Sequence, residues 1–103
     1  MKYFKALREV SKHEIRAFLA AHEAWIKSGR NIRPPTELKG ADLEGINFEG
    51  ANLKGANLQE CNFEGSNLMN ANLYGANLRE ANLQEVNLEN AILETANLKG
   101  ANI

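Results

Sequence analysis

Residues that could act as nucleophiles, bases or metal ligands are few in this sequence and widely spaced. His13 and His22 lie nine positions apart, and Cys61 is the one cysteine among 103 residues. The paired cysteines and the His-Glu-x-x-His spacing of zinc sites do not occur, nor does a glycine-rich phosphate loop or a Gly-x-Ser-x-Gly turn. The sequence therefore predicts a protein without catalytic activity, and we expect neither a cofactor nor a metal site.

The same residues have structural interpretations. Ser11 is followed three positions later by Glu14, the pattern of a helix capping box. Cys61 and Ser66 stand where the surrounding sequence repeats a small apolar residue, so both are expected to point inward. A single buried thiol behaves as a small apolar group and cannot form an internal disulfide. His22 lies on an apolar stripe and is interpreted as a packing residue.

Most of the chain is a five-residue repeat that runs from Thr36 to Ile103. The third residue of each block is Leu or Phe, except Ile103 in the last block, and a small or medium residue stands two places earlier. Asn or Asp lies between them, except at Glu37 and Ile92. The expected inward residues are Leu38, Leu43, Phe48, Leu53, Leu58, Phe63, Leu68, Leu73, Leu78, Leu83, Leu88, Leu93 and Leu98.

A period of five matches neither a helix nor a strand, so the repeat needs a geometry of its own. The first and third residues of a block point to one side, as in a strand, and the last two must turn the chain. Four right-angled blocks close a coil of 20 residues, and coils stack about 4.8 Å apart. Most fifth positions hold Gly or Asn, which suit a turn with positive φ. Other turn types are expected at Glu60, Glu80, Glu85 and Thr95.

The Ala-Asn-Leu-x-x blocks resemble those of the pentapeptide repeat proteins, whose fold is a right-handed quadrilateral β-helix. The resemblance covers about two thirds of the chain, and the layout is similar to small bacterial members with a helical N-terminal cap. It implies an all-β solenoid with an α-helical cap at residues 1–33 and a repeat β-helix at residues 34–103. Most members of the family have no assigned activity, and a minority resemble DNA and bind type II topoisomerases.

The N-terminal segment has helical periodicity in two parts. Apolar residues at helical spacing in residues 2–10 (Tyr3, Phe4, Leu7 and Val10) favour a short helix. A longer helix is predicted from Ser11 to about Gly29, although one kinked helix is also possible. Pro34 and Pro35 prevent a helix from continuing. We expect this segment to cover the first coil, because stacked repeats expose an apolar end. The packing residues would be Phe18, His22, Trp25 and Ile26.

Charge is divided between the two parts of the chain. Residues 1–33 carry a net charge of +5 and residues 34–103 a net charge of −6. The sequence shows no signal-peptide pattern and no apolar run long enough to span a membrane, so a cytoplasmic location is expected.

Candidate protein contacts are outward residues that interrupt the polar wall. Positions 20 apart should stack in columns, so Met69 and Tyr74 would lie on adjoining faces and Ile92 one coil below Tyr74. We expect no covering segment after the last coil, so Ile103 should lie at an open end that supports a weak homodimer.

Three functions remain open at this stage. The first is a scaffold or protein-interaction module. The second is a DNA mimic that binds a type II topoisomerase, although roughly 3.4 coils make a short rod and basic residues dilute its acidic columns. The third is nucleic-acid contact through the basic residues of the N-terminal segment, namely Lys2, Lys5, Arg8, Lys12 and Arg16.

Overall fold

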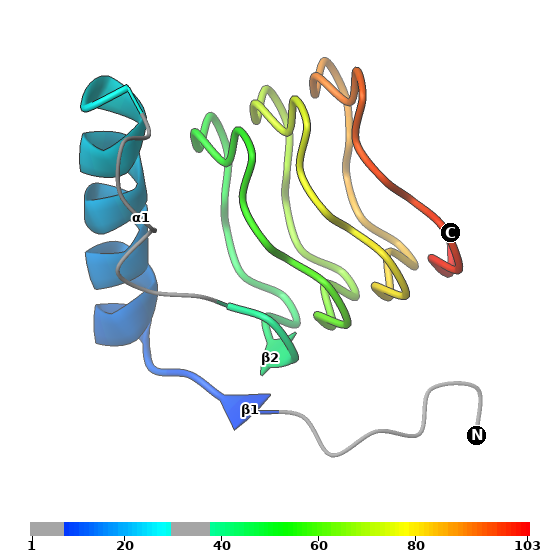
Figure 1. Ribbon diagram of the computed structural model, residues 1–103. Helices are drawn as coiled ribbons and strands as arrows, with labels where there is room; N and C mark the ends of the chain where they lie inside the picture. Colours follow the sequence, from blue (N-terminus) through cyan, green and yellow to red (C-terminus); the bar gives the residue numbers. More distant parts are fainter. Residues whose placement is uncertain (1–7, 30–37) are drawn as a thin grey trace.

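The computed structural model describes residues 8–29 and 38–103. Its elements in chain order are β1 (Arg8–Glu9), α1 (Lys12–Lys27) and β2 (Ala41–Asp42), after which the chain continues as stacked coils. α1 stands beside the first coil, and the C-terminus lies at the far end of the stack (Figure 1). The predicted apolar spacing of Tyr3, Phe4 and Leu7 and the proline pair at 34 and 35 lie outside the described residues.

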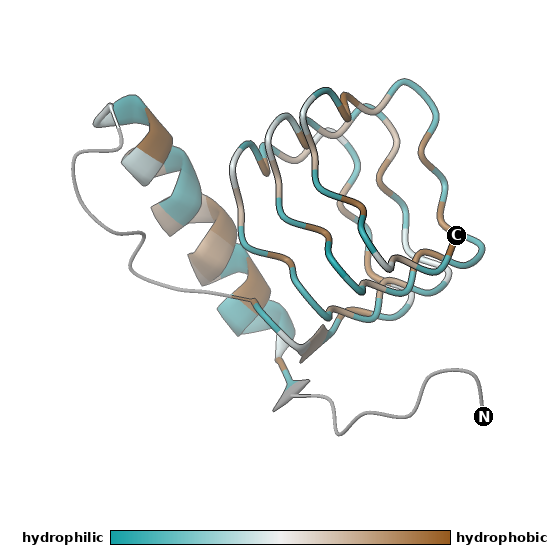
Figure 2. Ribbon diagram, turned by 45° about the vertical axis from the view of Figure 1, so that its right-hand side comes forward, coloured by the Kyte–Doolittle hydropathy of each residue, from teal (hydrophilic) through white to brown (hydrophobic). Residues whose placement is uncertain are grey.

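The coil repeats every 20 residues, as the five-residue period predicts. On one face, parallel bridges join Asp42 to Asn62, Asn62 to Asn82 and Asn82 to Asn102, and bridges on the other faces have the same separation. Within a bridge, the N–H of Asn67 donates to Ile46 O at 2.9 Å, and Asn67 O accepts from Phe48 N at 2.7 Å. Polar and apolar residues alternate along the sides of each coil (Figure 2).

The inward leucines and phenylalanines form the core. Phe48 and Phe63 meet edge to face, with ring centroids 5.9 Å apart. Burying each such side chain contributes about 1.5–3 kcal/mol. The leucines in the middle of the stack are wholly buried, whereas Leu88, Leu93 and Leu98 in the last coil are half-buried. The fully buried leucines of the middle coils are Leu58, Leu68, Leu73 and Leu78.

Every corner is a turn closed by a hydrogen bond from an amide to the inward residue three positions earlier, as from Ala41 N to Leu38 O at 2.9 Å. The expectation of other turn types at four non-glycine corners is wrong. Glu60 has φ 64° and Thr95 φ 58°, and both corners keep the same hydrogen bond. The physical reason is pairing between coils. The Glu60 amide donates to Arg79 O at 2.9 Å, and at the Thr95 corner Glu94 O accepts from Gly75 N at 2.9 Å. The other two corners, at Glu80 and Glu85, also have positive φ.

The outward asparagines are structural. From Asn47 to Asn97, each outward Oδ1 accepts from the backbone N–H two residues later, as in Asn47 with Glu49 at 3.0 Å. Amides also bond from coil to coil, with Asn82 Nδ2 donating to Asn62 Oδ1 at 3.0 Å. Ile92 occupies this position and has no side-chain oxygen, so its corner lacks the hydrogen bond between side chain and backbone.

The N-terminal segment pairs with the first coil before it becomes helical. β1 runs parallel to β2, with Arg8 opposite Ala41 and Glu9 opposite Asp42. The predicted helix over residues 2–10 is therefore wrong at Arg8 and Glu9, because the open edge of the first coil offers these residues backbone partners.

α1 begins and ends where the sequence predicts. Ser11 caps it, with Glu14 N donating to Ser11 Oγ at 3.1 Å and Ser11 N donating to Glu14 Oε1 at 3.4 Å. The helix ends at Lys27, and Gly29 follows with φ 82°. Among residues 8–29 and 38–103, no helix has the length and apolar composition that crossing a membrane requires.

Candidate functional site

α1 packs its apolar stripe on the first coil. Ile15 and Phe18 are buried in the same cluster as Leu38 and Leu43. Trp25 and Ile26, at the C-terminal end of the stripe, are half-buried. The four residues named as cap packing therefore differ in depth, and Ile15 lies deeper than two of them.

His22 joins the helix to the coil through a polar contact. It is 2% exposed, and its Nε2 lies 2.8 Å from Lys54 O at a corner of the first coil. Its ring stacks on Phe18 at a centroid distance of 5.4 Å and tilts against Trp25 at 5.1 Å. The ring thus links the apolar stripe of the helix to a backbone carbonyl of the coil.

Two of the candidate contact residues come together on one face. The bridge between Asn72 and Ile92 places Ile92 one coil below the repeat that carries Tyr74. Tyr74 is 41% exposed and Ile92 44%, and Lys54 Nζ lies 5.4 Å from the Tyr74 ring centroid. Met69 belongs to the preceding repeat and is half-buried on the adjoining face. We call Tyr74 and Ile92 the apolar wall.

Ile103 lies apart from the apolar wall, at the open end of the stack, where it is 78% exposed. The amides of Leu88, Leu93 and Leu98 make no backbone hydrogen bond within residues 8–29 and 38–103. Leu83, by contrast, is only 4% exposed, and its amide donates to Asn102 O at 2.7 Å. Residues 101–103 supply that cover.

Two further reactive side chains, Cys61 and Ser66, are buried, whereas Ser11 and His13 are exposed. Cys61 is fully buried and its thiol donates to Leu38 O at 2.8 Å. Ser66 is 1% exposed, and its Oγ has no hydrogen-bond partner among the residues that the structure describes. In the part of the chain that the structure describes, no three His, Cys, Asp or Glu residues gather in a way that could hold a metal ion.

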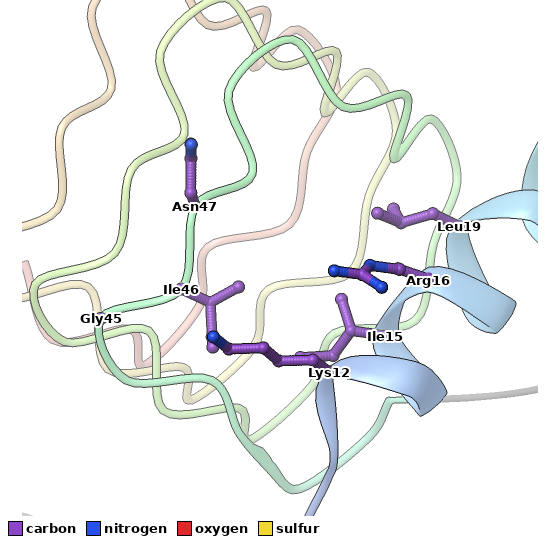
Figure 3. A pocket seen from close by; sticks show the side chains of 7 residues that line it. All are labelled: Lys12, Ile15, Arg16, Leu19, Gly45, Ile46 and Asn47. Atoms are coloured by element: carbon purple, nitrogen blue, oxygen red, sulfur yellow. The ribbon is translucent and has the colours of Figure 1, made fainter.

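Sequence reasoning missed a groove of about 370 Å³ between α1 and the first coil. Lys12 and Arg16 extend from α1 toward the corner that carries Ile46 (Figure 3). The groove depends on how the helix crosses the coil, which no repeat pattern encodes. One signal was present, since Ile46 replaces the Ala of most repeats. The groove is lined by Lys12, Ile15, Arg16, Leu19, Gly45, Ile46 and Asn47.

The repeats of this chain match those of a known protein family. A family model described as pentapeptide repeats matches eight copies, at residues 36–70, 46–84 and 71–103. The crystal structure of Rfr23, a pentapeptide repeat protein from the cyanobacterium Cyanothece 51142, is 44% identical over 63% of this chain, with a TM-score of 0.62. HetL, from the cyanobacterium Nostoc sp. strain PCC 7120 and involved in heterocyst differentiation regulation, is 40% identical over the same share, with a TM-score of 0.43.

This chain matches 45% of the length of Rfr23 and 33% of that of HetL. A comparison with curated proteins found no match. The comparisons give no support to the topoisomerase and nucleic-acid alternatives.

Proposed function

Because the chain belongs to the pentapeptide repeat family, with its right-handed quadrilateral β-helix, we propose that it is a non-enzymatic module that binds a partner protein through its outer surface. The family model covers the coil, and the coil itself accounts for the inward leucines and the outward asparagines. Residues that the coil does not require are therefore the candidates for binding.

The observation that carries this proposal is the apolar wall. An Asn at position 92 would supply the side-chain oxygen that accepts a backbone hydrogen bond at other corners. Ile92 lacks this hydrogen bond and exposes apolar surface in its place. Tyr74 adds an aromatic ring on the same face, with Lys54 above it. Aromatic residues in an apolar patch ringed by polar side chains are enriched where proteins bind one another. Met69 would extend the contact onto the adjoining face.

The test is affinity capture from the source organism with purified wild-type protein and two variants. Ile92→Asn restores the repeat residue, and Tyr74→Ala removes the ring, so neither change disturbs the core. Each should reduce capture of a shared partner at least tenfold. Gln84→Ala, on another face, is the control and should capture that partner as the wild type does. Equal capture by all four proteins would show that the wall is not the contact.

A second part of the proposal concerns α1, which we assign as the cap of the stack. In that arrangement, residues 1–33 form the cap and residues 34–103 the β-helix. Phe18 and His22 support it by their burial, and Trp25 and Ile26 extend the same stripe. A cytoplasmic location is part of the proposal and is consistent with a single buried cysteine.

The open end supports a weak homodimer. Two molecules related by a two-fold axis would cover each other's half-buried leucines and Ile103. One coil end offers a few hundred Å² per partner, below the area typical of stable dimers, so the affinity should be low. Ile103→Lys would place a charge in this contact. Sedimentation over a hundredfold concentration range should show self-association that this variant abolishes, and a wild type that stays monomeric throughout would contradict the dimer.

A further inference from the structure

The first coil has an open backbone edge beside the groove. Within the stack, Asn67 uses its N–H and its C=O to pair with Ile46 and Phe48 of the coil before it. Asn47 presents the same two groups one coil earlier, and no residue in 8–29 or 38–103 pairs with them. Unpaired strand edges of this kind are templates for a further strand.

β1 shows that this edge accepts a strand that is not part of the repeat. Arg8 and Glu9 pair with Ala41 and Asp42, one repeat before Asn47. The chain then leaves the edge at Ser11 and begins α1. The ladder that β1 starts is therefore broken off before it reaches Asn47, and the groove lies at this point, with α1 as its second wall.

The residues that line the groove are apolar on one part and cationic on another. Ile15, Leu19 and Ile46 supply apolar surface, and the cationic groups of Lys12 and Arg16 stand one helical turn apart at its margin. Both cations are exposed, and within the described residues neither makes an ion pair. A ligand that alternates apolar and acidic groups would meet both kinds of surface.

We propose that this groove binds one extended, acidic peptide segment of a partner protein, which adds as a strand at Asn47. The Asn47 N–H donates to a peptide carbonyl, and Asn47 O accepts from a peptide amide two residues further on. An acidic side chain lies between Lys12 and Arg16, while an apolar side chain packs on Ile46. Strand addition gives affinity through main-chain bonds and specificity through alternate side chains. This site is separate from the apolar wall, so it does not depend on that surface.

The test uses the full chain, labelled with ¹⁵N, and a capped six-residue peptide of alternating valine and glutamate. At saturation, amide hydrogen exchange at Asn47 should slow at least tenfold. Asn52 provides a control in the same molecule, since its amide also has no backbone partner within the described residues and it does not line the groove. Exchange at Asn52 should not change.

Two altered peptides separate strand pairing from charge. N-methylation of a central amide removes a main-chain donor and should weaken binding at least tenfold. Replacing the glutamates by glutamines should weaken it about three- to fivefold for each ion pair lost, the scale of exposed pairs. Arg16→Gln should have the same effect as the loss of one pair. Lys99→Gln, an equal charge change in the last coil, should bind as the wild type does.

Three outcomes would overturn the proposal. The first is an unchanged Asn47 exchange rate at millimolar peptide. The second is equal binding of the N-methylated peptide, which would show that no strand forms. The third is binding of hexanoate to the groove with no protection of Asn47 by peptide, which would make the groove a site for small amphipathic anions. A glutamine peptide that binds as tightly as the glutamate peptide would remove the acidic preference.

Discussion

The two ends of the coil stack carry the same repeat in different surroundings. At the first coil, the exposed fractions of Leu38 and Leu43 are 2% and 0%. At the last coil, Leu93 and Leu98 are half-buried, although each follows an Ala two positions earlier, as Leu43 does. The difference is α1, which places Phe18 against the first coil. Burial of a repeat leucine is therefore decided by what lies beyond its coil, and only indirectly by its own block.

The turns differ between the two ends as well. Every fifth position of the first coil is glycine, at residues 40, 45, 50 and 55. In the last coil, Glu85, Asn90 and Thr95 have φ between 58° and 60°, and only Gly100 is glycine. A side chain in the left-handed region costs about 1–2 kcal/mol relative to ordinary backbone. The open end is thus both less covered and more strained, and local unfolding should begin there.

The largest effect is expected when the first coil, which α1 covers, is exposed. Removing residues 1–28 would expose the first coil and take away the partners of β2, so the protein should aggregate through its bare edge. A milder variant, Phe18→Asp, should lower the unfolding temperature sharply, whereas Ala20→Asp, on the exposed side of α1, should not. The measurements are light scattering and thermal unfolding. A truncated protein that stays monomeric and equally heat-resistant would show that α1 does not protect this end.

A matched pair of leucine substitutions measures the same contrast inside the stack. Leu73 is fully buried, and Leu73→Ala should destabilise by about 2–5 kcal/mol because it leaves a cavity. Leu98→Ala removes the same atoms from the half-buried end, where water can fill the space, and should cost about 1 kcal/mol. Urea unfolding of both variants gives the two values. Similar losses would mean that the last coil is covered in solution, as a dimer would cover it.

Ser66 provides a test in the well-covered part of the stack. Its buried Oγ has no hydrogen-bond partner within residues 8–29 and 38–103, and most blocks carry Ala there. Ser66→Ala should therefore stabilise by about 1–2 kcal/mol. Ser11→Ala is the matched control, because it removes a hydroxyl that caps α1 and should destabilise by about 1 kcal/mol. Chemical denaturation of the two variants should therefore give opposite signs. A loss of stability in Ser66→Ala would indicate that the hydroxyl finds a partner in solution.

Much of this architecture could be predicted because the sequence repeats each local requirement many times. The five-residue period implies a 20-residue coil, and the bridge from Asn62 to Asn82 has that offset. The ends of α1 are also encoded locally, in the capping pair of Ser11 and Glu14 and in Gly29. These features depend on residues that are neighbours in sequence, which is why pattern reasoning finds them.

The features that could not be predicted depend on distant partners. β1 is two residues long, and its pairing with Ala41 joins positions 33 apart, so Arg8 and Glu9 carry no periodic signal of a strand. Glu60 keeps a positive φ because a neighbouring coil holds its amide, which overrides its own preference. The groove at Ile46 depends on the angle at which α1 crosses the coil. Of the candidate contacts, only Tyr74 and Ile92 could be placed together from the 20-residue spacing.

The smallest expected effect tests whether strain at the open end is real. Thr95 is β-branched and has φ 58°, a conformation that such residues rarely adopt. Thr95→Gly should stabilise by about 0.5–1 kcal/mol, the relief of the left-handed cost less the entropy that glycine loses on folding. The stability of Thr95→Asn should lie between those of the wild type and Thr95→Gly, since asparagine tolerates this region of backbone conformation. Thermal unfolding and hydrogen exchange in the last coil would measure both.

The reverse change at the covered end completes the comparison. Gly45→Thr should destabilise by an amount similar to the gain at Thr95, because φ there is 68° and nothing lies within 4 Å to clash with an added Cβ. Backbone strain is then the main difference between the two variants. Thr95 also lies near Gly75, where an added Cβ would be 3.5 Å from Thr95 Oγ1. The contrary result is that Thr95→Gly lowers the stability while Gly45→Thr lowers it as expected. The packing of the Thr95 side chain near Gly75 would then contribute more than its backbone strain costs, and strain would not make the open end less stable.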